Sequence, residues 1–251
     1  MLDVALIQDR TSGWPGLTIQ AAATRDSTQL AATRELATTA LPFVVLAEAQ
    51  TAGIGRTGHT FSSPAAAGLY LSLAFAPPAA LPLALVTPAA GVALQEAIAA
   101  ELDVTTQIKW VNDLLWHERK VAGILATAVP SPTGGALRVI LGVGVNLRPR
   151  PAVPLAAMAL PIGWLQDAKA PDCRASLAAA FLSRLAARLA APAGIMPAYR
   201  QHAAWLGATV TLTGAGPVQT GTIAGFANDG SLQLATTKGL VTAATGSIRR
   251  R

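Results

Sequence analysis

A glycine-rich segment with one arginine stands out in this chain: Glu48-Ala49-Gln50-Thr51-Ala52-Gly53-Ile54-Gly55-Arg56-Thr57-Gly58-His59. It follows an apolar, β-branched run at 43–47, which predicts a strand that leads into a loop. Glycines let backbone N–H groups come close to a phosphate or carboxylate, and Arg56 adds a planar cation. Because most glycine-rich turns bind nothing, the segment alone is weak support for an anion site.

A second polar segment lies further along the chain. It reads Lys109-Trp110-Val111-Asn112-Asp113, so a lysine, an amide and a carboxylate occur within five residues. Together with the glycine-rich segment, this pattern predicts a site for an anion that carries a nucleotide.

Length and composition predict a globular protein. A chain of 251 residues is long enough for one sizeable domain and a small one, and 52% hydrophobic residues with 13% charged residues favour a large core. The net charge of +6 suits either acidic ligands or nucleic acid. Because no stripe of lysine and arginine is interleaved with aromatic residues, a nucleic-acid-binding module is the minor alternative.

The composition also bears on location and on metal sites. No charged residue occurs between Arg56 and Glu96, but four prolines interrupt that stretch and favour buried strands and turns over a membrane span: Pro77, Pro78, Pro82 and Pro88. The N-terminus has no basic region followed by an apolar core, so we expect a cytoplasmic protein. The single cysteine, Cys173, allows no intrachain disulfide, and the spacing of the histidines predicts no zinc site: His59, His117 and His202.

Periodicity predicts an α+β fold with a mixed or antiparallel sheet covered by helices on one side. Strands are expected at 43–47, 69–75, 81–86, 106–110, 114–116, 121–128 and 137–147. Helices are expected at 28–39, from Thr87-Pro88 onward with the threonine as cap, and at 174–189.

The sequence pattern changes from about Leu206 onward. Short strands are predicted there at 208–213, 218–227, 231–236 and 240–244. Asn228-Asp229-Gly230 between two of these runs is a strong hairpin signal. We therefore predict two domains, a main domain at 1–205 and a small β barrel at 206–251.

Four ordered blocks between residues 26 and 147 resemble the biotin protein ligases, also called biotin–[acetyl-CoA carboxylase] ligases. The glycine-rich segment is similar to the family's ligand loop, and Lys109–Asp113 is similar to its Lys-Trp-Pro-Asn-Asp block. Arg119-Lys120-Val121-Ala122-Gly123-Ile124-Leu125 and Gly142-Val143-Gly144-Val145-Asn146-Leu147 resemble two further blocks. Asp26-Ser27-Thr28 fits an early Asp-Ser-Thr element, and the small barrel would be SH3-like.

The resemblance implies an activity and a set of substrates. Biotin and ATP, the latter with Mg²⁺, would form biotinyl-5′-AMP, and the biotinyl group would pass to a lysine of a biotin carboxyl carrier domain. The lack of an N-terminal DNA-binding domain implies a monofunctional ligase that is no repressor and binds no DNA. Because family members often pair through sheet edges, we expect a monomer or a homodimer, and the prolines named above favour a protein without a membrane partner. The alternative within this fold is a lipoate or octanoate ligase or transferase.

The resemblance also implies roles for individual residues, and it implies no metal ion bound permanently by the protein. Lys120, Arg56 and Asp113 would be catalytic, with Lys120 bridging the biotin carboxylate and the α-phosphate. The biotin site would comprise Ser27, Thr28, Gln50, Gly53, Ile54, Gly55, Arg56, Lys120, Gly123 and Gly142. The nucleotide site would comprise Arg56, Lys109, Trp110, Asn112, Asn146 and Arg249.

Several of these roles have alternatives. Ser27 and Thr28 can also cap a helix, Trp110 can belong to the core, and Arg249 can lie in a solvated tail. Asn112 and Asp113 can orient Lys120, hold Mg²⁺ or receive the incoming amine.

The loop also departs from the family pattern. Ile54 and His59 stand where the family carries arginines, and Phe61 stands where it carries tryptophan. Because the loop has fewer cations, it predicts a looser hold on the adenylate than in typical members.

Overall fold

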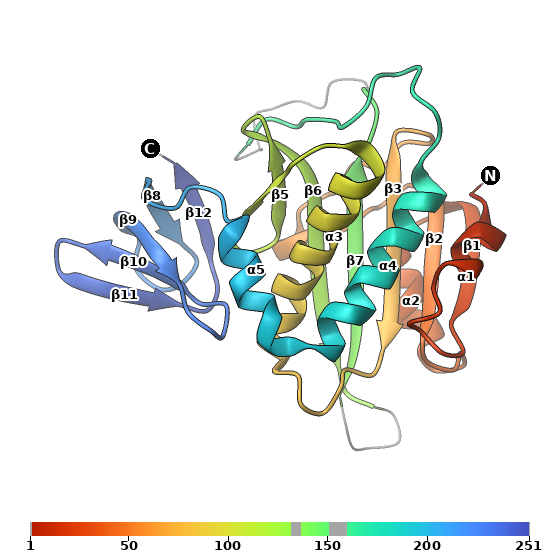
Figure 1. Cartoon of the computed structure of the whole chain (residues 1–251), viewed down its shortest axis with the longest axis horizontal. Coiled ribbons are helices and arrows are strands. Elements are labelled where there is room, and N and C mark those ends of the chain that lie inside the picture. Colours follow the sequence, from red (N-terminus) through yellow and green to blue (C-terminus); the bar gives the residue numbers. More distant parts are fainter. Residues whose placement is uncertain (1, 132–136, 151–159, 251) are drawn as a thin grey trace.

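The computed structural model describes residues 2–131, 137–150 and 160–250. Its centre is a seven-stranded sheet in the order β1-β2-β3-β7-β6-β5-β4, in which β1 and β2 are parallel and all other neighbours are antiparallel (Figure 1). The strands are β1 (Thr18–Arg25), β2 (Phe43–Gln50), β3 (Gly68–Phe75), β4 (Gln107–Lys109), β5 (Asp113–Trp116), β6 (Arg119–Val129) and β7 (Arg138–Asn146). The predicted mixed sheet is confirmed.

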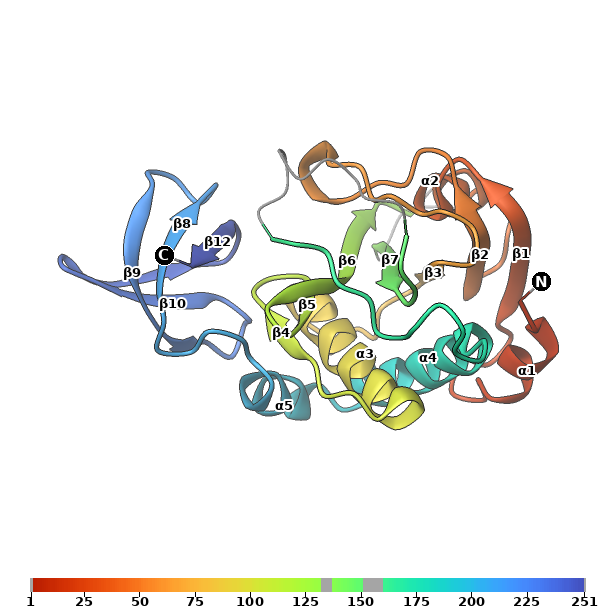
Figure 2. The same ribbon diagram turned by 90° about the horizontal axis from the view of Figure 1, so that it is seen from above.

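Long helices cover one face of this sheet. They are α3 (Val86–Leu102) and α4 (Arg174–Ala190), with α1 (Val4–Asp9) and α5 (Ile195–Gln201) beside them (Figures 1 and 2). By length and composition the segment Leu83–Leu102 could cross a membrane, but 67% of its apolar window is buried inside the protein, where α3 packs on α4 and β6. It is therefore a core helix.

A shorter helix, α2 (Thr28–Glu35), lies on the opposite face (Figure 2). Its buried Ala31 and Ala32 pack with Phe43, Val45 and Ile140 of the central strands. Coverage of one side only was therefore a wrong prediction, because β2 carries large apolar side chains on both of its faces. The rest of this second face is left for the candidate site.

The C-terminal residues form a second, five-stranded antiparallel sheet in the order β11-β10-β9-β8-β12. Its strands are β8 (Thr209–Thr213), β9 (Gln219–Phe226), β10 (Leu232–Thr236), β11 (Gly239–Ala243) and β12 (Ser247–Arg250). The hairpin predicted at Asn228–Gly230 joins β9 to β10. We call β8–β12 the small sheet; the boundary at 205/206 between two domains stays a prediction.

Some elements differ from the sequence-based expectations. The run at 81–86, expected as a strand, forms the 3-10 turn η2 (Leu83–Leu85), which continues directly into α3. Leu85 rather than Thr87 stands before that helix, since the turn already supplies helical backbone and no extended cap is needed. Four further elements were not expected from the sequence: β1, β12, α1 and α5.

Candidate active site

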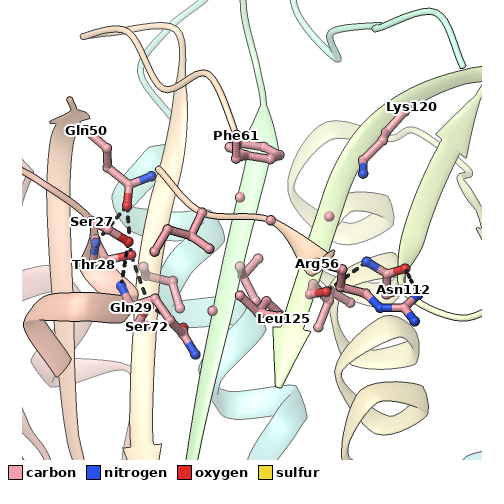
Figure 3. A pocket seen from close by; sticks show the side chains of 18 residues that line it. Ser27, Thr28, Gln29, Gln50, Arg56, Phe61, Ser72, Asn112, Lys120 and Leu125 are labelled. Carbon is pink, nitrogen blue, oxygen red and sulfur yellow. Dashed lines mark hydrogen bonds between the residues drawn. The ribbon is translucent and has the colours of Figure 1, made fainter. Parts of the chain in front are cut away.

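A pocket opens on the face of the large sheet that carries α2. It holds about 460 Å³ of space, part of it open to solvent, between the start of α2, the strands β3, β7 and β6, and the loop that follows β2 (Figure 3). The register places Ser72 beside Gly142 and Gly144 beside Gly123, so these positions form one floor. Many predicted site residues line this pocket: Ser27, Thr28, Gln50, Ile54, Gly55, Arg56, Asn112, Lys120, Gly123 and Gly142.

Neutral hydrogen-bonding groups form one end of the pocket, which we call the inner end. The Ser27 hydroxyl caps α2 by accepting from the backbone N–H of Gln29 at 3.2 Å, which confirms its capping role. The backbone N–H of Thr28 donates to Gln50 Oε1 at 2.7 Å, and Gln50 Nε2 donates to Ser63 Oγ at 2.7 Å. Both ends of the Gln50 amide are therefore fixed, so the predicted polar residues meet in a pre-formed group.

Eight lining residues were not predicted as site residues, and three of them have polar or aromatic side chains: Gln29, Phe61 and Ser72. Ser72 is fully buried, and apart from Tyr70 it is the one residue of β3 whose side chain carries a polar atom, a signal that could have identified it. Gln29 directly follows the predicted Ser27 and Thr28, but its helical position gave no sign that it faces the pocket. The Phe61 ring lies over the pocket between the inner end and Lys120 (Figure 3).

Close contacts explain two of the glycines. A Cβ at Gly53 would overlap the carbonyl oxygen of Phe61, so the loop can fold back on itself only with glycine there. A Cβ at Gly144 would come within 2.5 Å of the Phe61 ring. The loop and the aromatic wall of the pocket thus depend on missing side chains.

Charged and amide side chains form the opposite end, which we call the outer end. Arg56 Nη1 donates to Asn112 Oδ1 at 3.0 Å and to the carbonyl oxygen of Gly246, in the small sheet's last turn, at 3.3 Å. Asn112 Nδ2 in turn donates to the carbonyl oxygen of Ile124 at 2.9 Å. Asn112 thereby holds Arg56 against β6 (Figure 3).

Two lysines share one carboxylate beside this end. Lys120 Nζ lies 2.6 Å from Asp113 Oδ1, and Lys109 Nζ lies 3.5 Å from Asp113 Oδ2. Lys120 is partly exposed and lines the pocket, whereas Lys109 is buried, with its ammonium group 5.6 Å from the centre of the Trp205 ring. Burial lowers the pKa of Lys109, and the Asp113 charge opposes that shift. Asp113 is thus placed to orient Lys120.

The remaining predicted residues lie outside the pocket lining. Trp110 is buried in the core and donates from Nε1 to the carbonyl oxygen of Gly230, so its ring has no face free for an adenine and its core alternative holds. Asn146 is buried, and its Nδ2 donates to the carbonyl oxygen of Lys120 at 3.3 Å. Arg249 is exposed on β12, a paired strand rather than a solvated tail, next to Arg250, whose Nη1 lies 3.5 Å from Glu118.

A second, larger hollow begins at the outer end, with about 980 Å³ of space that includes open solvent. It shares Arg56, Asn112, Ile124 and Leu125 with the pocket and extends between the start of α3, β6 and the turn at Asp229–Ser231 of the small sheet. A ligand that fills the pocket therefore meets further open space beyond the Arg56–Asn112 pair.

Solved structures of known proteins share this fold. A biotin protein ligase from Aquifex aeolicus in complex with biotin and ATP aligns with a TM-score of 0.78 and 23% identity, over 93% of this chain and 99% of that one. A biotin acetyl coenzyme A carboxylase synthetase from Helicobacter pylori with bound biotinylated ATP aligns with a TM-score of 0.64 and 19% identity, over 94% of this chain and all of that one. At these identities the likeness shows the fold alone.

Sequence comparison gives nearer relatives. The bifunctional ligase/repressor BirA of Escherichia coli is 35% identical over 57% of this chain, which spans 44% of that relative. The biotin–[acetyl-CoA-carboxylase] ligase of Mycobacterium tuberculosis is 33% identical over 71% of this chain, which spans 65% of that relative. Residues 21–146, which are half of the chain and include every residue that lines the pocket, match the family model directly. The chain belongs to the biotin/lipoate A/B protein ligase family.

Proposed function

We propose that this protein is a biotin protein ligase. It activates biotin with ATP to form biotinyl-5′-AMP and pyrophosphate, and it passes the biotinyl group to a lysine of a biotin carboxyl carrier domain. One observation carries the proposal: a single pocket combines a neutral, hydrogen-bonding inner end with a cationic outer end (Figure 3). Such a pocket suits an acid whose far end is polar but uncharged and whose carboxylate must meet a phosphate.

The outer end supplies the groups that the first step requires. A biotin carboxylate oxygen attacks the α-phosphorus of ATP, a P–O bond forms, and pyrophosphate leaves. Because two anions must approach each other, fixed cations lower the barrier. Lys120 lines the pocket with its ammonium group, and Asp113 holds it in place at 2.6 Å. In this proposal Lys120 bridges the carboxylate and the α-phosphate, while Arg56 binds the phosphate or the adenylate from the loop.

The outer end would also hold the nucleotide, with Asn112 and Arg56 already paired there. We expect Mg²⁺ to arrive with the triphosphate. Both carboxylate oxygens of Asp113 face lysine ammonium groups, a poor arrangement for a cation ligand, so among its three possible roles the geometry favours orienting Lys120. Buried Lys109 contributes positive potential rather than a direct contact.

The second step needs no nucleophile from the protein. The Nζ of the carrier lysine attacks the acyl carbon of the mixed anhydride, an amide forms, and AMP leaves while the amine loses its proton. The protein's task is to keep water away from the anhydride until the carrier arrives. We propose that this takes place in the cytoplasm, in a monomer or homodimer, without DNA or a membrane as partner.

Pyrophosphate release with biotin, lipoate and octanoate, measured side by side, tests the proposal. We expect ATP-dependent release with biotin, and a biotinylated carrier domain once that domain is added. Release with lipoate or octanoate but not with biotin would instead assign the chain to the lipoate branch of its family. No ATP-dependent release with any acid, together with salt-sensitive binding of nucleic acid, would favour the binding-module alternative.

A further inference from the structure

Gln29 is a polar side chain of the inner end to which the proposed reaction gives no role. It is the second residue of α2, it is 8% exposed, and it lines the pocket beside Thr28 and Ser72 (Figure 3). A buried amide that faces a ligand site needs either a protein partner or a ligand partner for each of its polar atoms.

The orientation of the Gln29 amide is fixed by an unambiguous acceptor. One amide atom lies 3.2 Å from the carbonyl oxygen of Ile140, and a carbonyl can only accept, so that atom must be the donor Nε2. Nε2 also lies 3.2 Å from Thr127 Oγ1. The carbonyl oxygen, Oε1, consequently faces the other way, toward Ser72 and the floor of the pocket.

Gly142 leaves the space that this oxygen occupies. A Cβ at Gly142 would come within 2.5 Å of Gln29 Oε1, so the missing side chain admits the amide. The resemblance predicted that this glycine makes room for the ring system of the ligand. In the structure the room at that point holds a hydrogen-bond acceptor, which becomes part of the wall that a ligand meets.

Gln29 Oε1 has capacity to accept another hydrogen bond. Ser72 Oγ is 3.1 Å from Gln29 Oε1 and 2.9 Å from Thr28 Oγ1, but a hydroxyl has one hydrogen to give. An amide oxygen has two lone pairs, so at least one remains for a donor from the ligand. A ligand without a donor would bury that lone pair unpaired.

We propose that Gln29 determines substrate specificity by accepting a hydrogen bond from an N–H of a cyclic urea, and that it thereby disfavours acids with an apolar far end. This rests on the proposed function, since biotin carries a ureido ring while lipoate and octanoate carry none. Leaving a buried acceptor unpaired costs more binding free energy than a missing methylene, and sites built around such a bond discriminate strongly.

The variant Gln29→Met tests this, because methionine has nearly the same length but no amide. Pyrophosphate release is measured with biotin, with desthiobiotin, which keeps the ureido ring and lacks the thioether, and with octanoate. We expect kcat/KM to fall about tenfold or more for the two ureido acids, mainly through KM, and to stay level or rise for octanoate. If octanoate gives no pyrophosphate, its inhibition constant against biotin supplies the same comparison.

Thr127→Val is the matched control. It removes the exposed partner of Nε2 but leaves the carbonyl of Ile140 to hold the amide, so the selectivity should stay within about twofold of wild type. If Gln29→Met fails to fold, Gln29→Ala, which leaves room for water at Ile140, takes its place with the same expectation.

The two proposals fail in different ways. Wild-type protein that uses octanoate and ignores biotin overturns the proposed function. Wild-type protein that prefers biotin, combined with a Gln29 variant whose ratio of biotin to octanoate is unchanged, overturns the role of Gln29 alone. An equal fall for all three acids also overturns it, because that pattern marks a purely structural side chain.

Discussion

The inner and outer ends of the pocket are built in opposite ways. The inner end comes from two short stretches, the start of α2 and the end of β2 with its loop, plus one serine of β3, and its hydrogen bonds are formed among neutral groups. The outer end joins a loop arginine, an asparagine before β5, a lysine on β6 and a carbonyl of the small sheet. The inner end therefore rests on hydrogen bonds among neutral groups around the start of α2, whereas the outer end rests on charged groups tied to the small sheet.

This difference implies that binding and chemistry can be separated by substitution. On the proposed function, substitutions at the outer end should abolish adenylate formation while biotin still binds.

Lys120→Ala should have the largest effect. Without the ammonium group between carboxylate and phosphate, we expect adenylate formation to fall by about 10²–10³-fold or more, as measured by biotin-dependent pyrophosphate release. The affinity for biotin alone, measured by calorimetry, should fall far less, because the inner end is unchanged. Lys238→Ala, which removes an exposed lysine of the small sheet, is the control. An unchanged rate would remove Lys120 from its role and the separation with it.

Arg56→Ala should act mainly on the intermediate. The substitution removes the bonds to Asn112 and to Gly246, so the loop loses its tie to the small sheet. We expect biotinyl-5′-AMP to leave the protein faster and carrier biotinylation to slow by about 10–100-fold, measured by rapid filtration of the labelled adenylate. Arg10→Ala, at an exposed position, should behave as wild type. Retention of the adenylate equal to wild type would contradict this role.

Trp110→Phe should affect stability more than catalysis. The phenyl ring keeps most of the core volume but cannot donate to the carbonyl of Gly230, so a part-buried acceptor loses its partner. We expect the free energy of unfolding to fall by about 1–3 kcal/mol in urea, with kcat/KM changed much less. Trp164→Phe, at a position 38% exposed, should leave stability unchanged. If the loss of kcat/KM, converted to free energy, exceeded the loss of stability, Trp110 would instead be assigned to the nucleotide site.

Asp26→Asn should have the smallest effect and a pH dependence. The exposed Arg34 guanidinium binds Asp26 at 2.8 and 2.9 Å and lowers the pKa of that carboxyl from 3.8 to about 2. The charged form is therefore favoured in the folded state, so the stabilisation is present above pH 3.8 and is lost as the pH falls toward 2.

The substitution should lower the free energy of unfolding by less than about 1 kcal/mol near neutral pH. The difference in the free energy of unfolding between variant and wild type should shrink to zero as urea titrations are repeated at lower pH. A gap that stays constant down to pH 3 would show that the pair does not titrate in this range.

Much of the large sheet was predictable because its strands are short apolar runs between glycines and polar turns. β3 and β7 match the expected runs closely, and α4 matches its apolar stripe. β1 was missed because polar side chains such as Gln20 and Arg25 alternate along an edge strand and weaken the apolar signal. The run at 81–86 was misassigned because its apolar content is the same in a strand and in a buried first turn.

The candidate site was predictable where a motif is contiguous and not where partners are distant. Ser27, Thr28 and Gln50 meet as expected, since each belongs to a block that the sequence displays. Gln29 was missed because its role depends on Thr127 and Ile140, which lie on other strands far along the chain. Trp110 was assigned to the nucleotide because a motif reveals residue type and not burial.

Three hydrogen bonds that join the small sheet to the rest of the chain end on main-chain carbonyls of the small sheet. Arg56, Trp110 and Arg200 donate from side chains, while Gly246, Gly230 and Phe226 receive with main-chain carbonyls. A carbonyl is present whatever the side chain, so these three bonds depend only on the backbone path of the small sheet. The bond from Arg200 to the Asn228 side chain and the ion pair between Arg250 and Glu118 depend on its side chains as well. In a chimera assembled from two homologues, the three carbonyl bonds should form wherever these donors and that backbone path are kept, whereas the other two contacts should form only where the grafted small sheet supplies counterparts of Asn228 and Arg250.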